Sequence, residues 1–195
     1  MEATTALTNT VFIIFCILVV GLFMELFQSL LIKIFTRAFG SKFAYTFLNR
    51  ITFIGVMHHE LSHALFTLLT GARIEKINLF KPDEQTGTLG NVVYSTRGLL
   101  PIRCIQYTLI SIAPVICGSI TCTLMVLFVK LDAIWEVLVF GFILLCIVIH
   151  MNISKQDLKV ALKGFPFCLL LIYLGFYMSN FDLLKYLSEY FVNKG

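Results

Sequence analysis

The 195-residue chain contains 58% hydrophobic residues and only 13% charged residues, against about 25% charged residues in ordinary soluble domains. This composition excludes a typical soluble domain and predicts a membrane protein. The net charge of +4 is modest, and the 15 Lys and Arg residues lie mostly in short connections, which favours contact with lipid headgroups and argues against nucleic-acid binding.

The first apolar run, Val11 to Phe35, is long enough to cross a hydrocarbon core of roughly 30 Å as a helix. No basic residue precedes it, and it exceeds the apolar core of about 7–15 residues found in cleavable signal peptides. We therefore expect it to stay in the mature protein. The basic and aromatic segment that follows, Thr36 to Arg50, is typical of a connector at headgroup level.

Further apolar runs cover Ile51 to Thr70, Ile105 to Val129, Ile134 to Met151 and, more briefly, Phe165 to Met178. They predict an all-α polytopic membrane protein of about five transmembrane helices, forming a single domain over residues 1–195. In a five-span topology the basic residues divide eight against seven between the two sides, so charge does not fix the orientation.

Polar segments complete the predicted organisation. In the region of about 72–97, "IEKINLF" and "TLGNVVYST" flank the turn-rich "KPDEQTG", a pattern that predicts a membrane-associated β-hairpin. His150 to Gly164 has the composition of a polar, basic connection, and about 179–193 that of an amphipathic helix on a membrane surface.

The cysteines lie in or beside apolar runs without C-x-x-C spacing, which predicts small packing residues and no disulfide or zinc-thiolate framework. They are Cys16, Cys104, Cys117, Cys122, Cys146 and Cys168.

The segment His59-Glu60-Leu61-Ser62-His63 has the H-E-x-x-H pattern inside the second apolar run. On a helix, positions i and i+4 share a face, so His59 and His63 can bind one metal ion while Glu60 takes a proton from water. This combination predicts metal-assisted peptide hydrolysis. The alternative is a polar cluster that packs helices, although ionisable groups at membrane depth cost about 2.5–3.5 kcal/mol each and usually serve a function.

Catalytic zinc takes three protein ligands, so a third ligand is required. Asp157 is favoured because a return through two helices after the motif brings its end of the chain back to the side where His63 lies. Two alternatives stay open. Asp83 and Glu84 lie downstream in a polar turn, and Glu25, the lone carboxylate of the first run, is a ligand, a proton-path residue or a hydrogen-bonded contact in the bundle.

Several neighbours are candidates for supporting a ligand or contacting substrate. His150 lies seven residues before Asp157, on the same face if the helix continues, and can orient a ligand, line the water entrance or simply lie at the interface. His58 cannot share the ligand face and supports a ligand or contacts a neighbouring helix. Asn152 and Ser154 can hydrogen-bond the loop that carries Asp157.

The stretch "HELSHALFTLLTGARIEKINLF" resembles the site-2 protease family of intramembrane zinc metalloproteases, in particular its short forms, and the resemblance extends over Ile51 to Gly164. It implies one Zn²⁺ per chain, a membrane protein or peptide as substrate, and an active site near the cytoplasmic face of a cell membrane. By residue, it implies His59, His63 and Asp157 as zinc ligands, Glu60 as general base and Ala72 to Thr96 as the hairpin.

Two segments depart from the family pattern. In "SIAPVICGS", Ala113 and Cys117 stand where the family has the Gly and Asn of Gly-Pro-x-x-Asn, so a contact from that amide to substrate or oxyanion is missing. In "IHMNISKQDLKVA", Ile149 and Asn152 replace the family's Asn-x-x-Pro, and Leu158 replaces the Gly after the aspartate.

The predicted function is an intramembrane zinc metalloprotease. One alternative is a degenerate protease, a non-catalytic zinc-binding membrane scaffold that binds single-pass partners. Another is a transporter, because intramembrane Glu and His can relay protons, although no inverted repeat is visible. The segment Gly87 to Thr96 either pairs with an extended substrate or only braces the motif helix.

Overall fold

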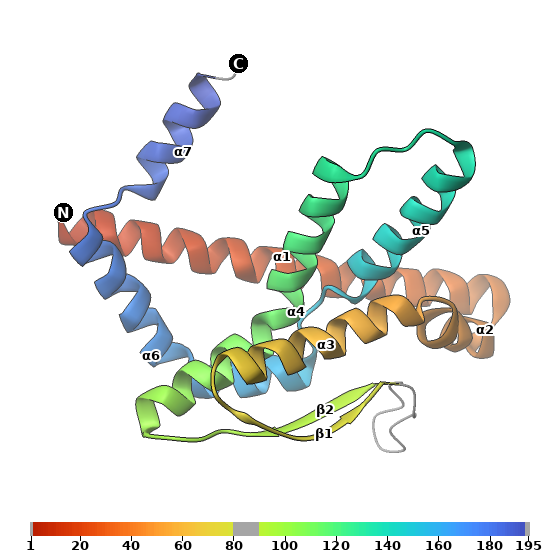
Figure 1. Ribbon diagram of the computed structural model, residues 1–195, viewed down its shortest axis with the longest axis horizontal. Coiled ribbons are helices and arrows are strands. Elements are labelled where there is room, and N and C mark those ends of the chain that lie inside the picture. The colour runs from red at the N-terminus through yellow and green to blue at the C-terminus, as the bar shows by residue number, and fades with distance from the viewer. Residues whose placement is uncertain (1, 80–89, 194–195) are drawn as a thin grey trace.

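The computed structural model describes residues 2–79 and 90–193, which form a mostly helical protein with one small sheet (Figure 1). In chain order the elements are α1 (Ala3–Phe39), α2 (Ser41–Thr46), the π-helical turn η1 (Phe47–Ile51), α3 (Phe53–Leu69), β1 (Arg73–Asn78), β2 (Asn91–Ser95), α4 (Leu100–Phe128), α5 (Ile134–His150), α6 (Lys155–Ser179) and α7 (Leu183–Val192).

Three helices in the described part of the chain, α1, α4 and α6, are long and apolar enough to cross a membrane. Helix α5 is apolar but has only 17 residues, and α3, also of 17 residues, contains the polar H-E-x-x-H motif. The fold is therefore a helical one of membrane type, and the number of about five spans stays a prediction.

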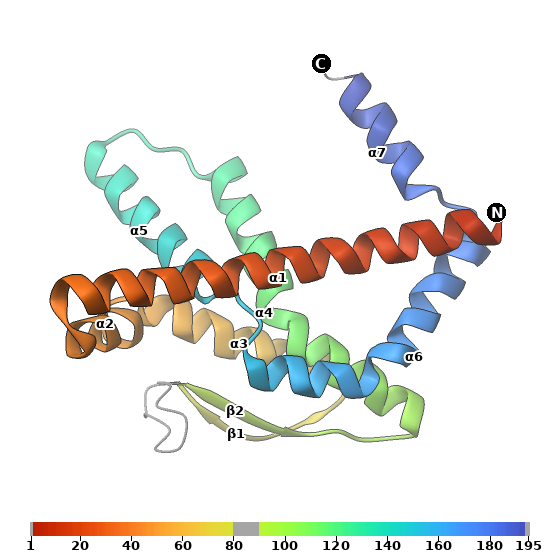
Figure 2. The same cartoon turned by 180° about the vertical axis from the view of Figure 1, so that it is seen from behind.

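Long helices dominate the arrangement. Helix α1 runs the length of the molecule, and α3, α4 and α5 lie on one side of it (Figures 1 and 2). The hairpin lies beside α3 on the side away from α1. Helix α7, which buries none of its residues, extends away from the body at the same end as the N-terminus. The motif helix α3 packs mainly against α4 and α5 and also contacts both strands of the hairpin.

Element boundaries differ from the predicted ones where a polar residue caps a helix. The predicted polar connection over His150 to Gly164 is wrong, because α6 begins at Lys155 and only residues 151–154 separate it from α5. The Ser154 hydroxyl accepts the Asp157 backbone N–H at 3.1 Å and so caps α6. Asp182 likewise caps α7, which begins at Leu183 and not near residue 179.

The hairpin agrees with the prediction over its described part. Strands β1 and β2 are antiparallel, with Arg73 opposite Ser95, Asn78 opposite Asn91, and an irregularity between Ile74 and Lys76. Gly71, with φ 74°, turns the chain from α3 towards β1. All six cysteines are free, but only Cys146 and Cys168 are buried and Cys16 is exposed, so the prediction of packing residues holds for only part of the set.

Glycines allow the helices of the core to approach closely. A Cβ atom on Gly164 of α6 would lie 1.9 Å from the Cys104 carbonyl oxygen of α4, and one on Gly55 of α3 would lie 2.0 Å from the Cys146 carbonyl oxygen of α5. The helix backbones therefore pack against each other directly at these two crossings. Any larger residue must push the helices apart.

We predict that Gly164→Ala lowers the melting temperature in detergent, because overpacking of a tight crossing costs about 1–3 kcal/mol. The matched control is Gly175→Ala in the same helix, where a Cβ atom would have no neighbour within 4 Å. The control should keep or raise the melting temperature, since Ala favours helix over Gly. Equal melting temperatures for the two variants would contradict this account of α4–α6 packing.

Candidate metal centre

Helix α3 brings the two motif histidines together. His59 and His63 lie one turn apart on the same face, and their Nε2 atoms are 3.1 Å apart. His63 is buried, whereas His59 retains partial exposure. The i, i+4 spacing of the motif therefore places both histidines on one face of the helix, as predicted.

Backbone carbonyls on two other helices orient these imidazoles. The Nδ1–H of His59 donates to the His150 carbonyl oxygen and that of His63 donates to the Ile110 carbonyl oxygen, both at 2.7 Å. A carbonyl can only accept, so in the neutral rings each Nδ1 bears the proton and each Nε2 bears a lone pair. Two facing lone pairs cannot hydrogen-bond to each other, and a shared cation is the natural partner for both.

Asp157 completes the group. Its Oδ1 lies 3.5 Å from His63 Nε2, and its Oδ2 lies 3.9 Å from His59 Nε2. The Ser154 hydroxyl donates to Asp157 Oδ2 at 2.5 Å and so fixes the carboxylate in the first turn of α6. The three side chains offer ligand atoms that all lie within 4.8 Å of one another, so His59, His63 and Asp157 can hold a metal ion.

The spacing of the ligand atoms suits a small tetrahedral ion. Nitrogen and oxygen ligands about 2.0–2.1 Å from zinc, at tetrahedral angles, are separated by roughly 3.3 Å. The separations of 3.1 Å between the two Nε2 atoms and 3.5 Å between His63 Nε2 and Asp157 Oδ1 lie close to that value. The donor set of two imidazoles and one carboxylate also matches catalytic zinc sites, which leave a further position open.

Glu60 lies between the metal group and the hairpin. The Val92 backbone N–H of β2 donates to its carboxylate. A Cβ atom on Gly90 would lie 2.5 Å from Glu60 Cγ, so β2 approaches the Glu60 side chain as closely as a glycine permits. The hairpin thus covers the predicted general base directly.

Tyr94 is a neighbour of the site that sequence reasoning missed. It follows Gly90 by four residues, so its side chain lies on the same face of the strand, and its phenol interacts with Ser111 of α4. Burial raises the pKa of Tyr94, and the charge of Asp157 adds to this effect. The phenol therefore remains a neutral donor near neutral pH. The sequence carried no signal for this neighbour, because the approach of Gly90 to Glu60 is visible only in the structure.

The predicted supporting histidines have separate roles. His150 orients His59 through its main-chain carbonyl, while its ring Nε2 lies 2.9 Å from the Thr52 hydroxyl. Because α5 ends at His150, the helix does not continue to Asp157 and the condition for a shared face is not met. His58 Nε2 lies 3.0 Å from the Thr121 hydroxyl on α4, which makes it a contact between helices.

The remaining candidates do not join the metal group. Among the described residues, Glu25 has no hydrogen bond or ion pair and lies outside the group, so the expected bundle contact is not formed. Asn152 hydrogen-bonds Gln28 and does not brace the Asp157 loop, which Ser154 does alone. Asp83 and Glu84 fall outside the described residues.

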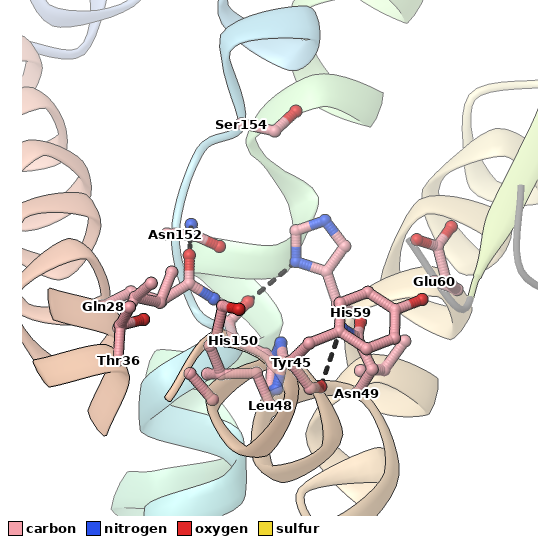
Figure 3. Close-up of a pocket in the computed structure, with 14 residues that line it drawn as sticks. Gln28, Thr36, Tyr45, Leu48, Asn49, His59, Glu60, His150, Asn152 and Ser154 are labelled. Atoms are coloured by element: carbon pink, nitrogen blue, oxygen red, sulfur yellow. Dashed lines mark hydrogen bonds between the residues drawn. The ribbon is translucent and has the colours of Figure 1, made fainter. Parts of the chain in front are cut away.

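A cavity of about 580 Å³ extends from the metal group towards α1 and α2 (Figure 3). Gln28, Ile32 and Thr36 form one wall, and their spacing of four residues places them on one face of α1. Sequence reasoning missed this wall although the spacing was visible. The lining residues are Gln28, Ile32, Thr36, Ser41, Ala44, Tyr45, Leu48, Asn49, Val56, His59, Glu60, His150, Asn152 and Ser154.

Comparison with known proteins gives no relative, since no protein-family model, curated protein or solved structure matches the chain.

We predict that the purified protein contains about one zinc ion per chain and that His59→Ala and Asp157→Ala each abolish zinc binding, because each removes one of three ligands. Elemental mass spectrometry of detergent-purified protein measures this directly. Glu25→Ala is the control and should retain zinc, as Glu25 lies outside the group. Zinc retained by Asp157→Ala would refute the assignment of the third ligand.

Proposed function

We propose that this chain is an intramembrane zinc metalloprotease, a multi-pass protein that hydrolyses peptide bonds of membrane-embedded or membrane-adjacent substrates. The observation that carries the proposal is the pair of histidine Nε2 atoms, 3.1 Å apart and both turned by backbone carbonyls towards Asp157. The resemblance of the motif and hairpin to the site-2 protease family supports the same activity.

The proposed topology includes α3 and α5 as the second and fourth of about five spans. Each has 17 residues, which corresponds to a length of about 25 Å. This is a little less than the hydrocarbon core of roughly 30 Å, a mismatch that local thinning of the bilayer accommodates. The proposal places the metal group near the cytoplasmic face of a cell membrane, with the N-terminus on that side.

In the proposed reaction Glu60 acts as general base and then as general acid. It follows the ligand His59 in the chain and lines the same cavity, so it can take a proton from water in the cavity and pass it to the leaving nitrogen. Zinc, when bound by His59, His63 and Asp157, would activate water and stabilise negative charge on the carbonyl oxygen. The neutral phenol of Tyr94 offers a further donor on the hairpin side.

A substrate helix must unwind locally before cleavage, because its peptide bonds are engaged in its own hydrogen bonds. Strand β2 is suited to receive the unwound segment. Its Val92 N–H points to Glu60, so this strand lies directly beside the proposed general base. An extended substrate pairing with this edge would gain main-chain hydrogen bonds next to the general base.

The alternative proposal is a degenerate protease that binds zinc and single-pass partners without cutting them. It is favoured by Ala113 and Cys117, which stand where the family has Gly and Asn. Under this alternative the metal group would serve only to join α3 to α6.

We predict that Glu60→Gln retains zinc but lowers the rate of peptide hydrolysis about 10²–10⁴-fold, because the amide cannot accept the proton from water. The measurement combines zinc content with mass spectrometry of new termini, using proteoliposomes that contain a library of single-pass peptides. Cleavage by this variant at the native rate would exclude Glu60 as the base. A zinc-loaded native protein that captures peptides without cutting any would establish the scaffold alternative.

We also predict that Gly90→Ala reduces hydrolysis while zinc content is unchanged, since the new methyl group must displace either β2 or the Glu60 side chain. Val93→Ala is the matched control on the same strand, because Val93 is exposed and its side chain lies on the opposite face. Kinetics of the two variants on one cleaved peptide provide the comparison. Equal rates would show that β2 does not position Glu60.

A further inference from the structure

One wall of the cavity carries a pair of amide side chains that the proposed reaction does not use. Asn152, between α5 and α6, donates through Nδ2 to Oε1 of Gln28 on α1 at 2.8 Å (Figure 3). The two residues are 124 positions apart in the chain. Both line the cavity that also contains His59 and Glu60.

This hydrogen bond leaves one donor group and one acceptor group facing the cavity. Among the described residues, neither Nε2 of Gln28 nor Oδ1 of Asn152 takes part in another hydrogen bond. A carboxamide carries both an N–H donor and a carbonyl acceptor on adjacent atoms. The Gln28–Asn152 pair is therefore complementary to one more carboxamide.

The rest of the lining supports an uncharged polar occupant. In the described part of the chain it includes the hydroxyls of Thr36 and Ser41 and the amide of Asn49, and no Lys or Arg residue. An acidic occupant would lack the N–H donor that Oδ1 of Asn152 requires. An apolar occupant would cover the Gln28 and Asn152 groups without replacing their contact with water.

We propose that Gln28 and Asn152 form a specificity subsite for an Asn or Gln side chain of the substrate, close to the peptide bond that is cut. This inference rests on the proposed function and narrows its substrate class. Ser154, which holds Asp157, lines the same cavity, so an amide bound to Gln28 and Asn152 lies beside the metal group.

Binding of short peptides to the zinc-loaded Glu60→Gln protein tests the subsite without requiring hydrolysis. The probes are fluorescein-labelled peptides, identical except for a central Asn, Leu or Asp, and fluorescence anisotropy in lipid nanodiscs gives their dissociation constants. The Asn peptide should bind at least about fivefold more tightly than the Leu peptide, which is the lower end of what two net hydrogen bonds contribute. The Asp peptide should also bind more weakly than the Asn peptide, because a carboxylate has no N–H to donate to Oδ1 of Asn152.

Substitutions then identify the residues responsible. Gln28→Leu should remove the preference for Asn over Leu. Asn152→Ala changes the other member of the pair and should have the same effect, so it serves as the test if Gln28→Leu does not fold. Gln28→Glu should shift the preference to a peptide with a central Lys, because a carboxylate replaces the amide. Glu25→Gln, on the same helix but outside the cavity lining, is the control and should leave the preference unchanged.

Equal binding of the Asn and Leu peptides to the parent protein, or an Asn preference that survives both Gln28→Leu and Asn152→Ala, would overturn the subsite. The outcome is distinct from failure of the proposed function. A preference controlled by Gln28 in a protein that cuts no peptide would support the subsite and reject the protease.

Discussion

Two hydrogen bonds from imidazole to backbone carbonyl determine the geometry of the whole site. The His150 carbonyl, at the end of α5, and the Ile110 carbonyl, inside α4, each accept an Nδ1–H from α3. They set the ring orientation and the tautomer of both motif histidines. Three helices must therefore be positioned to within hydrogen-bond distance for a metal ion to be held.

The packing of the bundle meets this requirement through direct contact of helix backbones. Gly55 on α3 lies against the last turns of α5, where a side chain would strike the Cys146 carbonyl and the His150 ring. Gly164 plays the same part between α6 and α4, and α6 carries Asp157. The close helix crossings at these glycines thus set where the metal ligands lie. Substitutions there are expected to change stability and metal affinity together.

Polar groups within an apolar bundle need hydrogen-bond partners, and other helices and the hairpin supply several of them at this site. Three polar residues of the site have partners from other elements: His58 with Thr121, His150 with Thr52, and Glu60 with the Val92 amide. Such satisfied groups cost little to bury. The side chains with remaining hydrogen-bonding capacity, Gln28 and Asn152, face the cavity, where a ligand or water can reach them.

Local periodicity accounts for what the sequence could predict. The spacing of His59 and His63 and the alternation in the hairpin required only the repeat of one element. The placement of Asp157 beside His63 was predicted from the return of the chain through two helices after the motif. The length of α6 was missed because its first turns are polar, although Lys155, Lys159 and Lys163 recur every four residues as on one helical face.

Contacts between distant helices could not be predicted in this way. The Gln28–Asn152 pair depends on how α1 crosses the bundle, and no pattern within either segment encodes that crossing. The prediction of a partner for Glu25 was wrong for a related reason. Burying a carboxylate is costly enough to require a partner only where the residue is fully enclosed, and Glu25 is only half-buried.

X-ray absorption at the zinc edge of the purified protein would test the central claim most directly, because it identifies the ligands of the metal. The account predicts nitrogen and oxygen neighbours at about 2.0–2.1 Å, outer scattering from two imidazoles and no sulfur. Sulfur neighbours at about 2.3 Å, or scattering from fewer than two imidazoles, would contradict a centre formed by His59, His63 and Asp157.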